Sequence, residues 1–255
     1  FPYELVPLPI VTAGSGSEVS VHPIGTGPYR FVRYAVDDHI VLASNADYWG
    51  GAPRNDGLVL KVVPDEVMRA LEVRKGTMDI VVNDVSPDLF FQLTQERSVQ
   101  STTSPGVDYQ YVGINLADPV LGDRRVRRAL AHAIDRQAIV KYLRRDLATP
   151  ATGLLPPISW AYRADAAEVA HNPRLARALL DEAGYPDPDG DGPSVRVTLS
   201  LKVSNLEFNR LQASVIQEDL RRVGVGLDVR TYEFATLFAD VIAGRFQLYT
   251  LQWTA

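Results

Sequence analysis

Strand-like and helical patterns alternate most clearly in the last third of the chain. Apolar residues occupy every second position from residue 195 to residue 203, which predicts a half-buried strand. Gly224 and Gly244 are expected to end two helices, because glycine adopts the left-handed backbone of a helix end at little cost. Further elements, in the order helix, strand, helix and strand, are predicted at residues 206–223, 225–232, 235–243 and 246–253. This order predicts a mixed sheet covered by helices, and therefore an α/β protein.

The middle of the chain is rich in helical signals. An extended segment at residues 107–116 is followed by Asp123, which is expected to cap a helix. Asp135 is the expected cap of the next helix, and Asn172 followed by proline predicts the start of another. The apolar face of the first of these helices comprises Val126, Ala129, Leu130, Ala133 and Ile134.

The first part of the chain has more strand signals. Two β-rich runs flank Asp37 and Asp38, as the strands of a hairpin would. Asp65 is expected to cap a helix that Gly76 ends, and Ser86 to begin a short second helix. The predicted strands are at residues 29–34, 40–44, 58–63 and 79–82. Because the helix lies between the last two strands, we expect a βαβ unit with a right-handed crossover.

These patterns divide the chain into three parts. We expect an N-terminal segment or linker at residues 1–24, a hairpin plus βαβ unit at residues 25–115, and a helical start followed by β-α-β-α-β at residues 116–255. The chain begins at Phe1 without an initiator methionine or signal pattern, and its last predicted strand runs almost to Ala255. We therefore expect a processed or partial segment, incomplete at both ends.

Composition excludes several classes of function. The chain has 255 residues, of which 46% are hydrophobic and 22% charged, as in ordinary globular proteins. A net charge of −5 disfavours a nucleic-acid partner, since phosphate binding needs an excess of lysine and arginine. The absence of cysteine excludes disulfides, iron–sulfur clusters and cysteine nucleophiles.

No motif predicts catalysis, a metal or a cofactor. The segment 187–192 resembles the start of a calcium loop, but its twelfth position is Thr198 instead of a bidentate glutamate, so we expect a solvated turn. Gly25-Thr26-Gly27 lacks the third glycine of a dinucleotide site. The histidines are far apart, and no nucleophile elbow occurs. Tyr109, Tyr111, Tyr249 and Trp253 fall at alternate strand positions and either pack in the core or line a cleft.

Several motifs, taken together and in order, resemble family 5 of the periplasmic solute-binding proteins, which includes oligopeptide, dipeptide and nickel-chelate receptors. They are Gly-Thr-Gly-Pro-Tyr-Arg-Phe at residues 25–31, Leu-x-x-Asn-x-Asp-Tyr-Trp-Gly at 42–50, a helix pair at 123–136 and a helix end at 176–185. Gln247 departs from the pattern, because the family commonly has aspartate there.

The resemblance implies a two-lobed periplasmic-binding-protein fold of type II, cluster C, with mixed β-sheets flanked by helices. Such lobes close by a hinge motion on a ligand, which then passes to the membrane permease of an ABC importer. The first lobe would end and the second begin within a crossing strand at residues 107–115. We therefore expect an extracytoplasmic protein, periplasmic or lipid-anchored, that acts as a monomer in transport and is not an enzyme.

The resemblance also implies a set of ligand-binding residues. Trp253-Thr254-Ala255 matches the first three positions of a Trp-x-Ala-Asp motif that supplies an aromatic wall and a partner for a peptide α-amino group, so we expect aspartate to follow. The expected ligand-binding residues are Asp108, Tyr109 and Gln110 on the crossing strand, Asn83 and Asp84 at the cleft rim, and Trp253.

Two other functions compete with this interpretation. A cytoplasmic transcriptional regulator can carry the same solute-binding module behind a DNA-binding domain, and an upstream basic helical domain or signal peptide would distinguish the two. An enzyme on a similar scaffold is the second alternative, because a fold does not fix a function. The sequence leaves open a dipeptide, oligopeptide, metal chelate, opine or sugar as ligand.

Overall fold

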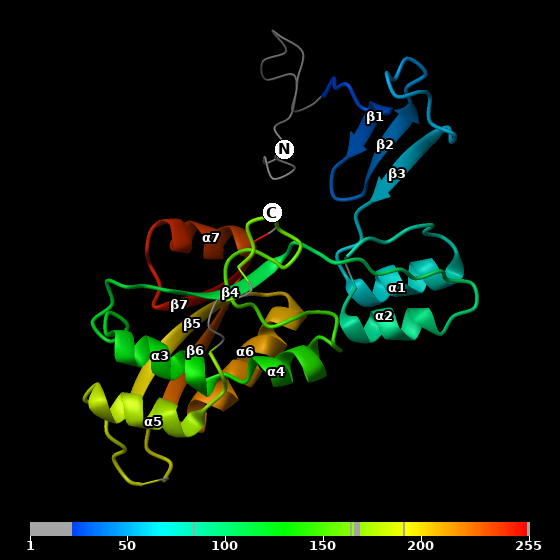
Figure 1. The fold of residues 1–255 in the computed structure, drawn as a ribbon. Helices are drawn as coiled ribbons and strands as arrows, with labels where there is room; N and C mark the ends of the chain where they lie inside the picture. Colours follow the sequence, from blue (N-terminus) through cyan, green and yellow to red (C-terminus); the bar gives the residue numbers. More distant parts are fainter. Residues whose placement is uncertain (1–21, 84, 164, 166–168, 191, 254–255) are drawn as a thin grey trace. The chain divides into compact units, whose positions relative to one another are not determined.

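The computed structural model describes residues 22–83, 85–163, 165, 169–190 and 192–253 (Figure 1). The chain forms two compact units, Phe1–Ser101 and Thr102–Ala255. The boundary between residues 115 and 116 that we expect from the sequence concerns the lobes of a complete receptor, and it stays a prediction.

The first unit contains a three-stranded antiparallel sheet in the order β1-β2-β3. Its strands are β1 (Tyr29–Ala35), β2 (His39–Ser44) and β3 (Gly57–Lys61). Asp37 lies in the turn between β1 and β2 with a φ of 58°, a conformation that aspartate tolerates better than most residues. The predicted hairpin and the third strand are therefore confirmed.

Two helices follow this sheet in the same unit. In α1 (Glu66–Lys75), the N-cap Asp65 accepts a hydrogen bond from the Met68 amide, and Gly76 ends the helix with a φ of 71°. The shorter α2 (Pro87–Thr94) has proline in its first turn. Ala70 of α1 and Leu93 of α2 are buried, and the two helices pack against each other.

The predicted βαβ unit is wrong. Residues 79–82 form no strand, and the side chains of Ile80 and Val82 are 75% and 68% exposed. An apolar run becomes a strand only when a neighbouring strand supplies hydrogen-bond partners, and β3 pairs with β2 in the antiparallel sense instead. The first unit is thus a hairpin with a third strand, followed by a helix pair.

The second unit is built on a four-stranded mixed sheet in the order β4-β7-β5-β6. Its strands are β4 (Tyr109–Ile114), β5 (Val197–Ser204), β6 (Val225–Tyr232) and β7 (Leu248–Trp253). β5 runs parallel to both β6 and β7, whereas β4 is antiparallel to β7. The mixed sheet that the sequence predicts is therefore confirmed.

Helices cover both faces of this sheet (Figure 1). α7 (Phe234–Ile242) lies on one face, and the opposite face carries α3 (Arg124–Ala133), α5 (Pro173–Glu182) and α6 (Glu207–Arg221). α4 (Arg136–Ala138) continues directly into a π-helix, η2 (Ile139–Leu143). Four of the five residues of the predicted apolar face are buried in α3, whereas Ile134 follows the helix and is half-buried. The caps Asp123, Asp135 and Asn172 each accept the expected backbone hydrogen bond.

The main hydrophobic core lies between the sheet and the three helices α3, α5 and α6. Leu199, Leu201 and Val203 alternate along β5 and are almost completely buried. Val126 and Leu180 contribute from α3 and α5 with no exposed surface. Because burial stabilises a fold by about 25 cal/mol per Å² of apolar surface, this core holds the sheet and its covering helices together. None of the described helices is long and apolar enough to cross a bilayer.

Candidate ligand-binding edge of the second sheet

The carboxyl ends of three strands meet at one edge of the second sheet. β5, β6 and β7 run parallel, so Ser204, Tyr232 and Trp253 all lie at this edge. The antiparallel β4 begins there, with Tyr109 directly opposite Trp253. In open α/β sheets, ligands bind outside the carboxyl ends of the strands, so this edge is the natural place for a binding site.

The structure brings four of the six expected ligand-binding residues to this edge. Tyr109 and Gln110 are the first two residues of β4, Asp108 immediately precedes them and is exposed, and Trp253 ends β7 with 58% of its surface exposed. Asn83 lies in the other unit, where it is exposed and has a φ of 60°. Asp84 lies outside the described residues.

Aromatic side chains form a row on the α7 side of β4 and β7. The rings of Tyr109 and Tyr111 stack with centroids 5.7 Å apart, and Tyr111 meets Tyr249 edge to face at 5.9 Å. Phe246 in turn packs edge to face on Tyr249 at 4.7 Å. Burial, together with a hydrogen bond to Tyr111, raises the pKa of the Tyr249 phenol to about 12. The inner part of this row is packed, whereas Trp253 stays exposed at its outer end.

The opposite side of the same edge carries a polar network that the sequence does not reveal. Arg144, which follows η2, donates a hydrogen bond from Nη2 to Oε1 of Gln110. Gln110 donates from Nε2 to Oδ1 of Asn209 at 3.3 Å, and Asn209 donates from Nδ2 to Oγ of Ser204 at 2.6 Å. The guanidinium carbon of Arg144 lies 4.0 Å from the ring centre of Phe208. A half-buried cation is thus held among neutral groups at the sheet edge.

Two opposing effects act on the charge of Arg144. Burial lowers the pKa of its guanidinium, and the nearby carboxylate of Asp108 raises it. Because arginine ionises far above neutral pH, the side chain keeps its charge under physiological conditions. The edge therefore carries a cation and an anion, Arg144 and Asp108, and no ion pair joins these two side chains in the described part of the chain.

A largely buried ion pair joins α7 to β5 near this edge. Nζ of Lys202 lies 2.6 Å from Oδ2 of Asp240, and the two side chains are only 12% and 16% exposed. Arg245 approaches the same carboxylate at 2.8 Å. Hydrogen bonds from Lys202 and Arg245 hold the pKa of the Asp240 carboxyl below its ordinary value of 3.8.

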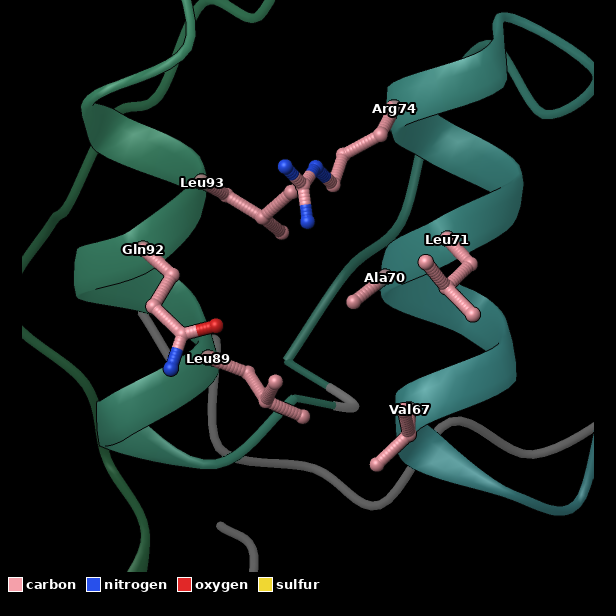
Figure 2. A pocket seen from close by; sticks show the side chains of 7 residues that line it. All are labelled: Val67, Ala70, Leu71, Arg74, Leu89, Gln92 and Leu93. Carbon is pink, nitrogen blue, oxygen red and sulfur yellow. The ribbon is translucent and has the colours of Figure 1, made fainter.

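A small apolar cavity lies between α1 and α2 of the first unit. Figure 2 shows side chains from both helices converging on it, with Arg74 at one end. Its volume is about 60 Å³. Ligand pockets usually measure about 300–1,000 Å³, so this cavity is too small to hold a peptide or a chelate. The lining residues are Val67, Ala70, Leu71, Arg74, Leu89, Gln92 and Leu93.

The acidic segment 187–192 uses its carboxylates to fold a turn. Asp187 accepts hydrogen bonds from the amides of Asp189 and Gly190, and Asp189 accepts one from the amide of Ser194. Arg196, only 3% exposed, lies 3.3 Å from Asp187. Among the described residues, no group of three or more acidic, histidine or cysteine side chains could hold a metal ion.

Comparison with known proteins identifies the family. The family model described as bacterial extracellular solute-binding proteins, family 5 middle, matches residues 2–255. The chain is 29% identical over 248 residues to the dipeptide-binding protein of Escherichia coli, which covers 96% of this chain and 45% of that protein. It is 31% identical over 226 residues to heme-binding protein A of Haemophilus influenzae, covering 89% of this chain and 41% of that protein.

Solved structures agree with this assignment. NikA from Brucella suis in complex with Fe(III)-EDTA superimposes with a TM-score of 0.83 and 26% identity, covering 91% of this chain and 49% of that one. The structural neighbours are two-lobed periplasmic binding proteins, which confirms the expected fold class. The chain spans about half the length of the relatives it matches, or less. It belongs to family 5 of the bacterial extracellular solute-binding proteins.

Proposed function

We propose that this chain forms part of the extracytoplasmic solute-binding component of an ABC importer and captures a peptide-like ligand in a cleft between two lobes. The observation that carries the proposal is the match of the family 5 model to residues 2–255. The resemblance to a dipeptide-binding protein over 96% of this chain supports a peptide-like ligand. Because the matched relatives are binding proteins, the proposed function is capture without chemical conversion.

The arrangement of groups at the sheet edge supports this proposal. Asp108 is an exposed carboxylate suited to a cationic group of the ligand, and Tyr109 and Trp253 offer aromatic surface from paired strands. We propose that Asn83 and Asp84 also take part in ligand binding. An extended peptide held through its backbone and termini leaves its side chains in hydrated pockets, which allows one receptor to bind many sequences.

The proposed cellular setting follows from the same family membership. The protein would act as a monomer outside the cytoplasmic membrane, either periplasmic or lipid-anchored, and would pass its ligand to a membrane permease. Closure of the lobes on the ligand is the step that the permease would recognise.

A thermal-shift screen of the complete protein tests the proposal. A ligand that binds only the folded state raises the melting temperature by mass action. We expect a rise with short peptides and none with mononucleotides or double-stranded DNA. A rise with DNA, or an upstream DNA-binding domain in the complete protein, would instead support the transcriptional regulator.

A further inference from the structure

The backbone on both sides of Arg144 departs from regular helix geometry. Arg144 follows the π-helix η2, a form that is rare in proteins and frequent at functional sites. The next two residues, Arg145 and Asp146, both have a left-handed backbone, with φ of 52° and 59°. Consecutive residues of this kind turn the chain sharply, and side chains other than glycine adopt the conformation unfavourably. This turn sets the direction of the chain immediately after Arg144.

The guanidinium of Arg144 is fixed in orientation but has most of its hydrogen-bonding capacity unused. Phe208 supports its face at 4.0 Å, and Gln110 accepts one hydrogen bond from Nη2. A guanidinium has five N–H donors, and in the described part of the chain Gln110 is the only hydrogen-bond acceptor that the guanidinium of Arg144 meets. A half-buried guanidinium with a single neutral acceptor can still form a pair with an anion through its remaining donors.

The nearby acidic residue does not fill this role. Asp108 influences the charge of Arg144 electrostatically, yet its carboxylate is exposed and makes no ion pair with the guanidinium in the described residues. The groups that hold the guanidinium of Arg144, the Gln110 amide and the Phe208 ring, are neutral. The planar fork of an arginine matches the two oxygens of a carboxylate.

We propose that Arg144 binds a carboxylate group of the captured solute and so selects carboxylate-bearing ligands. The inference rests on the proposed function, because it places the ligand at the same sheet edge. Gln110 then acts as a positioning residue: it orients the guanidinium and is itself held by Asn209 and Ser204. This differs from the direct ligand contact that the resemblance implies for Gln110.

Affinity measurements on the complete protein test the proposal. The probes are Ala-Ala and Ala-Ala-Ala as free acids, the same peptides as C-terminal amides, citrate and Fe(III)-EDTA. For the wild type, we expect binding of at least one carboxylate probe. Its affinity should fall about 10- to 100-fold in Arg144→Gln, because a charge-assisted hydrogen bond is lost. Arg144→Lys should recover part of the affinity, since lysine keeps the charge and loses the fork.

Arg128→Gln is the matched control, because Arg128 is an exposed arginine of α3 and its replacement causes the same change in net charge. We expect no change in affinity for this variant. The proposal is overturned if no carboxylate probe binds the wild type, or if Arg144→Gln and Arg144→Lys bind as the wild type does. If a neutral sugar binds and no carboxylate does, the role of Arg144 is contradicted, whereas solute capture is still supported. If Arg144→Gln does not fold, the lysine variant decides the question.

Gln110→Ala tests the positioning role. Free-acid over amide discrimination depends on the guanidinium orientation, so this ratio should fall several-fold in Gln110→Ala. In the double variant with Arg144→Gln the two losses should not add, because the residues act as one unit. An unchanged ratio with a lowered melting temperature would show that Gln110 is merely structural.

Discussion

Gly113 lies directly opposite Tyr249 in the β4–β7 ladder, and a side chain at position 113 would overlap the tyrosine ring. A Cβ atom there would fall 2.2 Å from both Cε1 and Cζ of Tyr249. Because the ring is packed between Phe246 and Tyr111, it has little room to move. The absence of a side chain at Gly113 therefore leaves the space that the Tyr249 ring occupies.

Gly113→Ala should destabilise the protein by about 1–3 kcal/mol through this overlap. The midpoint of urea unfolding measures the change. Gly153→Ala is the matched control, because a Cβ at position 153 meets nothing within 4 Å. Equal stability of the two variants would contradict the packing described for Tyr249.

Trp253 should report ligand binding by its fluorescence. Its side chain is 58% exposed at the end of β7, so a ligand at the sheet edge should exclude water from the indole and shift its emission to shorter wavelength. Trp253→Phe should abolish the shift, whereas Trp160→Phe, which removes an indole that is 86% exposed, should preserve it. A shift that persists in Trp253→Phe would place the ligand elsewhere.

The contribution of Asp240 to stability should depend on pH. Its pKa is lowered in the folded state, so its ion pairs stabilise the protein above its ordinary value of 3.8 and lose their effect as the pH falls through the lower folded value. Asp240→Asn should melt below the wild type at pH 7, and the difference should shrink well below pH 3.8. Asp228→Asn, which removes an exposed pair with Arg230, should change little at either pH. A gap that stays constant with pH would contradict this account.

The acidic turn at 187–192 should not bind calcium. Its carboxylates already accept backbone hydrogen bonds and face Arg196, so calcium at about 1 mM, within the affinity range of extracellular calcium modules, should leave the melting temperature unchanged. Arg196→Met should destabilise the protein by about 1–3 kcal/mol, because it removes the hydrogen bonds to Asp181 and to the Tyr185 carbonyl. A rise in melting temperature with calcium would contradict the conclusion that these carboxylates are used by the turn itself.

Local signals were sufficient to predict most helices and strands of the second unit. The cap residues Asp123 and Asn172 form the expected hydrogen bonds, and the alternation along β5 corresponds to a strand that is buried at Leu199, Leu201 and Val203. These features depend on neighbours within a few residues, which is why the sequence pattern contains them. Residues 79–82 show the opposite case, because whether an apolar run becomes a strand depends on a partner distant in sequence.

The candidate site was predictable only in part. Motif resemblance led to β4 and the end of β7, and the strand order then brings Tyr109 and Trp253 together. Arg144 has no such motif. Its importance comes from contacts with Gln110 and Phe208, which lie far from it along the chain and meet it only in the folded unit.

The most direct test of the account is an isothermal titration of the complete protein with the peptide that raises its melting temperature most. The account predicts saturable binding of one peptide per protein, with the peptide recovered chemically unchanged. No saturable binding, or recovery of a cleaved peptide, would contradict the assignment of this chain to solute capture.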